Sequence, residues 1–301
     1  MSNPLLFLAT VMIWGSTWIA INYQINVVDP AVSVAFRFSI AAVILGFWCW
    51  FRKLPLRMPF ETHKKLMLVG ILFYTLDYSF LYAAQHHIIS ALLALLSSSV
   101  IYINVVLRRV LLGKPMRLEV VIGATFGLIG IAMIFIPEFE AMSVNEGLTV
   151  GLLFAAASFL SAGVGNVVSE KILDVGTPVI QMNFWAMSYS LIFTFGFAFI
   201  SGASFTLPTV ASYYYALLYL ALFGSVLAFG AYMKLLQQIG SDKAAYVVLV
   251  YPIIALAIST LFEGYQWTIL SAIGVIVVLF GNAVAMGKIA LFMRKNSVVN
   301  T

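Results

Sequence analysis

Arg37 and Asp77 are the two side chains of this 301-residue chain best suited to chemistry, because each stands deep inside an apolar segment. If the apolar segments span a membrane, placing a cation this deep in the bilayer costs between about 3 and well over 10 kcal/mol. Arg37 must therefore face a partner or a water-filled cavity. At 1.5 Å per helical residue, Arg37 lies roughly 9 Å from the end of its segment and Asp77 roughly 12 Å from the end of the next. If the two segments are antiparallel, the opposite charges lie at similar depth.

This pair of charges has two interpretations. In the first, a structural ion pair neutralises both groups and fixes helix packing, as charged residues inside membranes usually do. In the second, Arg37 binds a substrate carboxylate, or Asp77 takes up a coupling proton. The two functional roles are compatible if the substrate competes with Asp77 for Arg37. The sequence leaves both interpretations open.

Aromatic and amide side chains at depth are softer candidates for a substrate site. Tyr78 and Tyr82 are four residues apart and share one helix face, with Asp77 beside them. Such a face can stack a ring or hold an ammonium group by cation–π attraction, or it can simply pack against other helices. The remaining candidates are Trp14, Tyr102, Asn166, Trp185 and Tyr246.

Pro252 falls in the middle of an apolar segment, where it cannot donate to the carbonyl of Val248. The freed acceptor suits an ammonium group or a hinge. A packing kink without a ligand is an equal alternative, because membrane helices tolerate proline. Pro252 joins the candidate site residues on this ground.

The elements that carry these residues are long apolar segments. A membrane-spanning helix needs about 20 apolar residues, and ten segments of roughly that length account for most of the chain. Hydrophobic residues make up 63% of the chain and charged residues 9%. We therefore predict an all-α integral membrane protein with ten transmembrane helices. The segments lie near residues 4–24, 30–51, 66–85, 89–107, 118–137, 148–169, 178–200, 211–236, 244–262 and 266–287.

Positive charges are distributed on one side only. If the loops between the ten segments are numbered along the chain, every Lys and Arg except Arg37 falls in an even-numbered loop or in the tail. The odd-numbered loops hold acidic residues but no Lys or Arg. Because cationic loops resist translocation, this pattern predicts that both termini are cytoplasmic. The net charge of +5 is thus a signal of topology and does not indicate a nucleic-acid partner. The cations are Arg52, Lys53, Arg57, Lys64, Lys65, Arg108, Arg109, Lys114, Arg117, Lys171, Lys234, Lys243, Lys288, Arg294 and Lys295.

The two halves of the sequence resemble each other. An offset of 151 places Ser90 on Ser241, Gly113 on Gly264, Gly123 on Gly274 and Gly130 on Gly281, and an offset of 147 places the run at residues 5–7 on 152–154. We predict a five-helix repeat at 1–143, a second at 144–288 and a cytoplasmic tail at 289–301. Because five is odd, the second repeat is inverted. Many secondary transporters have this arrangement, with the substrate near the midplane; a duplication without functional consequence is the alternative.

The chain resembles the EamA-type branch of the drug/metabolite transporter superfamily. The resemblance rests on the five-plus-five helices, on the run Trp14-Gly15-Ser16-Thr17, and on Pro252, Glu263-Gly264, Gly274 and Gly281. The sequence departs from the family pattern in its first half. At the offset of 151, Ile101 corresponds to Pro252 and Leu112 corresponds to Glu263. The resemblance implies an inner-membrane secondary transporter, often an exporter of amino acids or related metabolites, with a central cavity between the halves.

Several functions are disfavoured by absent motifs. The sequence has no phosphate-cradling loop for ATP and no metal-binding cluster of Cys and His, so we expect no cofactor and no enzyme activity. We expect a lipid bilayer and a small-molecule substrate as partners, with protons as a candidate coupling ion. The oligomeric state is open. The alternatives are broad efflux of amphiphilic or aromatic toxic compounds and, in another class, a membrane enzyme or non-transporting scaffold.

Overall fold

The computed structural model describes residues 2–25, 27–88, 93, 96–140, 146–262 and 267–287. Across these residues the chain is helical and contains no strand. Several sequence predictions lie outside them: the boundary between the two repeats at 143 and 144, the tail at 289–301, Lys288, Ser90, Glu263 and Gly264.

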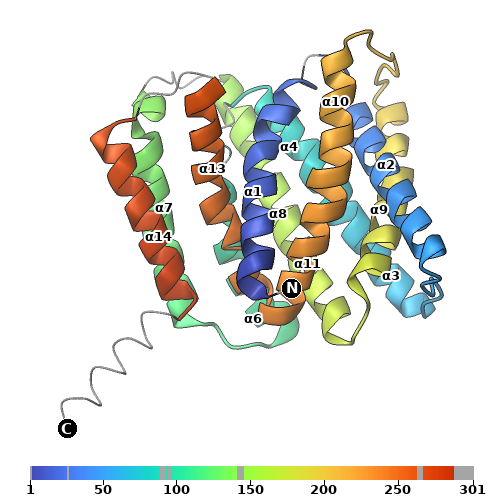
Figure 1. Cartoon of the computed structure of the whole chain (residues 1–301), viewed down its shortest axis with the longest axis horizontal. Coiled ribbons are helices and arrows are strands. Elements are labelled where there is room, and N and C mark those ends of the chain that lie inside the picture. The colour runs from blue at the N-terminus through green and yellow to red at the C-terminus, as the bar shows by residue number, and fades with distance from the viewer. Residues whose placement is uncertain are drawn as a thin grey trace.

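The helices form one bundle in which helices far apart in the sequence lie side by side, such as α2 and α9 (Figure 1). α1 begins at the lower edge of this view and α14 ends there. In chain order they are α1 (Asn3–Asn22), α2 (Pro30–Phe51), α3 (Phe60–Val69), η1 (Gly70–Leu76), α4 (Asp77–Gln85), α6 (Val100–Leu112), α7 (Leu118–Glu140), α8 (Glu146–Asp174), α9 (Val179–Ile200), α10 (Ala211–Tyr219), η2 (Leu220–Leu227), α11 (Ala228–Ile239), α12 (Ser241–Ala244), α13 (Val247–Phe262) and α14 (Ile269–Ala285).

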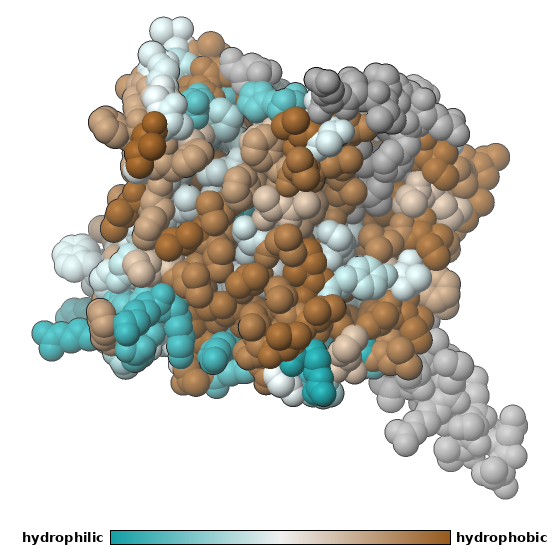
Figure 2. All heavy atoms as spheres, turned by 180° about the vertical axis from the view of Figure 1, so that it is seen from behind, coloured by the Kyte–Doolittle hydropathy of each residue, from teal (hydrophilic) through white to brown (hydrophobic). Residues whose placement is uncertain are grey.

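The chain is a multi-pass membrane protein by the length and composition of its helices. Within the described residues, seven helices are long and apolar enough to cross a membrane, and the shorter apolar helices Leu118–Ile134 and Ile269–Ala285 accompany them. Figure 2 shows the apolar side chains over the middle of the surface, with hydrophilic ones gathered mainly along the lower edge. α1 begins at this edge, on the side where the sequence predicts that Arg52, Lys53, Arg108 and Arg109 lie. We call it the cationic end.

Some predicted helix boundaries are wrong. The third span begins at Phe60 instead of residue 66, and α8 continues to Asp174 instead of ending at residue 169. Lys171 and Lys234, assigned to loops from the sequence, therefore lie within helices: Lys171 in the last turn of α8, and Lys234 inside α11. Charge alone does not end a helix, because side chains at helix ends reach water or a counter-ion while the backbone stays hydrogen-bonded.

The third and eighth spans each contain a π-helical segment. η1 joins α3 to α4, and η2 joins α10 to α11. Each has a glycine at a close approach: a Cβ on Gly70 would lie 2.5 Å from the carbonyl oxygen of Ala186, and one on Gly224 would lie 3.1 Å from the Arg37 guanidinium. π turns commonly occur at functional sites in helices.

Helix contacts join the two halves of the chain throughout. α7 packs against α14, α2 against α9, α1 against both α11 and α13, and α8 against both α4 and α6. The α7–α14 contact is a backbone contact, because a Cβ built on Gly281 would lie 2.5 Å from the carbonyl oxygen of Gly123. Small residues permit this approach where water does not drive helices together.

The glycine contact between α7 and α14 gives a first prediction. We expect Gly281→Ala to lower the free energy of unfolding by about 1–3 kcal/mol, because the added methyl group overlaps a backbone carbonyl that cannot move aside. Thermal unfolding of the purified protein measures the change. Gly196→Ala in α9 is the matched control, since a Cβ there meets no atom within 4 Å. Equal stability of the two variants would contradict the close packing.

Candidate functional site

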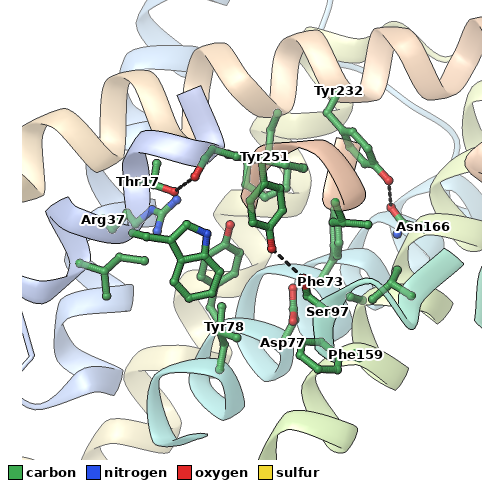
Figure 3. A pocket seen from close by; sticks show the side chains of 18 residues that line it. Thr17, Arg37, Phe73, Asp77, Tyr78, Ser97, Phe159, Asn166, Tyr232 and Tyr251 are labelled. Carbon is green, nitrogen blue, oxygen red and sulfur yellow. Dashed lines mark hydrogen bonds between the residues drawn. The ribbon is translucent and has the colours of Figure 1, made fainter. Parts of the chain in front are cut away.

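A pocket lies where helices of both halves meet, lined from α1, α2, η1, α4, α6, α8, α11 and α13. Figure 3 shows its side chains converging from several helices, with Arg37 at the left, Asp77 near the middle and Asn166 at the right. Of the ten site residues predicted from the sequence, five line this pocket. They are Trp14, Arg37, Asp77, Tyr78 and Asn166.

Arg37 is buried, and two helices contact its side chain. Its side chain is 1% exposed. Its Nε donates to Ser225 Oγ in η2 at 2.9 Å. The guanidinium carbon also lies 4.7 Å from the centre of the Tyr78 ring, a cation–π distance. Its Nη1 has no hydrogen-bond partner. A buried donor without a partner is costly, so Arg37 Nη1 retains an unused capacity to donate a hydrogen bond.

Asp77 follows η1 directly and is the first residue of α4. One of its carboxylate oxygens accepts a hydrogen bond from Ser158 Oγ on α8 at 2.6 Å. This bond ties α4 of the first half to α8 of the second. The pocket thus contains one cation and one carboxylate that are supported by different helices.

The ion pair considered from the sequence is not present. Among the described residues, no carboxylate lies within ion-pair distance of Arg37, and Asp77 has no cationic partner. The reason is direction: Arg37 turns toward η2, while Asp77 turns toward α8. The two charges share a pocket and do not neutralise each other by contact.

Aromatic rings form much of the wall between the two charges. The indole Nε1 of Trp14 donates to the carbonyl oxygen of Gly224 at 3.3 Å, which fixes the ring against Phe229. Trp18 and Tyr251 face each other with ring centres 6.1 Å apart. Such rings offer broad apolar surfaces with few polar contacts.

Asn166 lies in the pocket on the α8 side. Its Oδ1 accepts a hydrogen bond from the Tyr232 hydroxyl of α11 at 3.0 Å (Figure 3). Asn166 is 2% exposed, so this bond satisfies a side chain that is buried in the bundle.

The other predicted aromatic residues do not line the pocket. The Tyr82 hydroxyl donates to Gln24 Oε1 at 3.1 Å. Tyr102 bonds Thr125 across α6 and α7, and the Tyr246 hydroxyl donates to the Val120 carbonyl. Trp185 donates from Nε1 to the Leu56 carbonyl, in the loop before α3. These residues satisfy their polar atoms within the bundle, and we do not include them in the candidate site.

Pro252 is buried inside α13 and does not line the pocket, although its neighbour Tyr251 does. The carbonyl of Val248, which a proline leaves without its helical donor, accepts from Ser98 Oγ at 3.5 Å. A neighbouring hydroxyl therefore occupies the acceptor that we had considered for an ammonium group.

Several lining residues were missed by the sequence analysis. Two signals point to some of them: Trp18 is one turn beyond Trp14, and Phe229 stands at an offset of 151 from Tyr78. Ser158 and Ser225 carry no such signal, because serine is frequent in these helices. The missed lining residues are Thr17, Trp18, Ile21, Phe73, Leu81, Ser97, Val100, Phe159, Ala162, Phe229, Tyr232, Val248 and Tyr251.

The profile of the EamA-like transporter family matches residues 1–136 and 149–287 of this chain. The chain is 27% identical over 289 residues to the uncharacterized inner membrane transporter YedA of Escherichia coli, covering 93% of this chain and 89% of that protein. It is 24% identical to the uncharacterized transporter YoaV of Bacillus subtilis, covering 91% and 93%.

Two further similarities extend over nearly the whole chain. A probable amino-acid metabolite efflux pump of Escherichia coli is 22% identical and is covered over 93% of both chains. A solved crystal structure that is 19% identical matches with a TM-score of 0.77, over 94% of this chain and 96% of its own. At this identity the solved structure shows the fold alone.

The tyrosines outside the pocket give a second prediction. We expect Tyr82→Phe to lower the free energy of unfolding by about 1 kcal/mol, because buried Gln24 loses its hydroxyl donor. Tyr102→Phe, which removes a hydroxyl from an exposed bond, should change it by only a few tenths. Thermal unfolding of both purified variants checks the difference. A larger loss for Tyr102→Phe would contradict it.

Proposed function

This chain belongs to the EamA-like transporter family, and we propose that it is a secondary transporter that exports a small carboxylate-bearing metabolite, such as an amino acid, across the inner membrane by alternating access. The observation that carries the proposal is the buried Arg37 with an unpartnered Nη1 in a pocket between the two halves. Both termini would be cytoplasmic, as the positions of the Lys and Arg residues predict.

Symmetry in the contacts supports two inverted five-helix repeats. At an offset of 151, the contact of Gly123 with Gly281 becomes that of Gly274 with Gly130, and both contacts occur. A similar pair of contacts, Gly15 with Ile254 and Gly163 with Ile103, is related by shifts of 148 and 151, the first being one residue more than the shift of 147 at residues 5–7. Such paired contacts are expected of two repeats related by a two-fold axis, and an odd number of helices in each repeat would make the second one inverted.

The polar contacts that flank the pocket differ between the halves. In one, Arg37 of α2 donates to Ser225 of η2. In the other, Tyr74 of η1 donates to Asn183 of α9 at 3.2 Å. Tyr74 falls on Ser225 at an offset of 151. The second contact is neutral and satisfied, so the anion-binding role falls to Arg37 alone.

An amino acid fits the charges of the pocket. Its carboxylate would accept from Arg37 Nη1, and its ammonium group would approach Asp77, with the aromatic wall around the side chain. The name of the Escherichia coli relative, a probable amino-acid metabolite efflux pump, agrees with this substrate class.

Broad efflux of amphiphilic or aromatic compounds is the second candidate. The observation that favours it is the number of rings in the wall, including Trp14, Phe229 and Tyr251. Counterflow in proteoliposomes separates the two, because a narrow carrier exchanges one substrate class while a broad pump also accepts unrelated lipophilic cations.

The carboxylate anchor gives a third prediction. A thermal-shift screen against metabolites identifies a ligand, and counterflow then compares it with the analogue that lacks the carboxylate. We expect the wild-type protein to favour the carboxylate by at least about tenfold, because the analogue leaves a buried donor unpaired. Arg37→Gln should abolish this preference. Arg109→Gln, at an exposed position, is the control and should keep it. An unchanged preference in Arg37→Gln would contradict the anchor.

Asp77 gives a fourth prediction, which concerns coupling. If Asp77 carries the coupling proton, transport by the wild-type protein depends on pH, and Asp77→Asn removes that dependence because the amide does not titrate. Counterflow and proton-gradient-driven uptake at a series of pH values measure both. Ser158→Ala, which removes the hydrogen bond to Asp77 but keeps the carboxylate, should retain the dependence. An unchanged pH profile in Asp77→Asn would exclude the proton role.

A further inference from the structure

A buried ion network joins the two halves at the cationic end. At its centre is Arg108 of α6, which is 5% exposed. Its Nε donates to both carboxylate oxygens of Glu170 in α8, at 2.9 and 3.1 Å. Its Nη1 donates to Asp242 of α12 at 3.2 Å. One guanidinium thus connects three helices.

Further groups complete this network. Lys114 donates to Glu170 at 2.8 Å and to Asp174, and Arg117 Nη1 donates to Asp242 at 3.3 Å. Burial by itself would lower the pKa of Lys114, but the hydrogen bonds to Asp174 and Glu170 outweigh it and raise the pKa above its ordinary value. All three cations come from the first half of the sequence, and all three carboxylates come from the second.

Two helices of the network, α6 and α8, also line the pocket. Asn166 lines the pocket, and Glu170 is one turn farther along α8. Val100 lines it too, and Arg108 is two turns farther along α6. Asp242 lies in α12, directly before α13, which contributes the lining residue Val248. The pocket can open toward the cationic end only if these helices separate, which pulls the ion pairs apart.

The sequence positions that correspond to this network in the other half are uncharged. When the two halves are compared at the offsets of 151 and 147, each charged residue of the network corresponds to an uncharged residue in the other half. Arg108, Lys114 and Arg117 fall on Ser259, Tyr265 and Thr268, and Glu170, Asp174 and Asp242 fall on Tyr23, Val27 and Ala91.

We infer that this network is a latch, which holds the pocket closed toward the cationic end. It makes the closure of the pocket at this end stronger than the closure at the opposite end. The inference rests on the proposed function, since it assigns one gate of an alternating-access cycle. Separating buried charges is unfavourable unless water reaches them, so this closure is the stronger of the two. The protein therefore rests with the cationic end closed, and it opens there when the halves rotate apart.

Accessibility of the pocket to a thiol reagent tests the latch without any transport assay. Cys49 is the single cysteine and is buried, so Cys49→Ala removes it from the background. Ala162→Cys then places a reporter in the pocket. A membrane-impermeant maleimide is applied from the cationic face of sealed vesicles. We expect Arg108→Gln and Asp242→Asn to speed labelling roughly tenfold, because each leaves a buried charge unpaired in the closed state.

Arg109→Gln is the matched control, because Arg109 is the exposed neighbour of Arg108 and should leave labelling unchanged. Lys114→Gln, at the more exposed edge of the network, should give a smaller increase and serves if a central variant unfolds. Unchanged labelling in every network variant that remains monodisperse overturns the latch. Faster labelling in a protein that transports no substrate would sink the proposed function and leave the latch standing.

Discussion

A guanidinium inside an apolar bundle must find acceptors, and this constraint organises the structure. Two arginines are buried among the described residues, and they meet the constraint differently. Arg108 lies among carboxylates from two helices and is paired. Arg37 has a serine hydroxyl, an aromatic face and an Nη1 without a partner. The first arrangement suits a structural role, since breaking it leaves charges unpaired. The second suits the capture of an anion.

The backbone of the two halves is more alike than their side chains. Glycine contacts recur under exchange of the halves, as do the π-helical segments in the third and eighth spans. The charged groups do not recur: Arg37, Asp77 and the latch residues each have an uncharged counterpart. Under the proposed repeat, the two halves would close the pocket in similar ways, and the charges would make the closure at one end differ from that at the other.

Much of this protein could be predicted from hydropathy and charge. Ten apolar segments fix the class, and a charge in an apolar segment is conspicuous, so Arg37 and Asp77 were found without a structure. Membership of the EamA-like family confirms the resemblance inferred from the sequence. Tyr82, Tyr102 and Tyr246 show the limit of this reasoning. Whether an aromatic residue faces a pocket or a neighbouring helix depends on helix rotation, which continuously apolar segments do not encode.

The latch residues show a second limit. Glu170 and Asp174 were missed because an acidic residue near the end of a span looks solvated. Only the packing of α6, α8 and α12 reveals that Glu170 is 1% exposed. Long-range pairs such as Arg108 with Asp242 join residues 134 positions apart, and a single sequence without homologues carries no sign of such partners.

The glycine-mediated pair of α7 and α14 contributes no residue to the pocket. Its tight backbone contact and the candidate site are therefore separate parts of the described structure. Mutations that alter what the protein carries can accumulate on the other helices while this pair stays as it is. The α7–α14 pair can therefore stay the same in related proteins that carry different substrates.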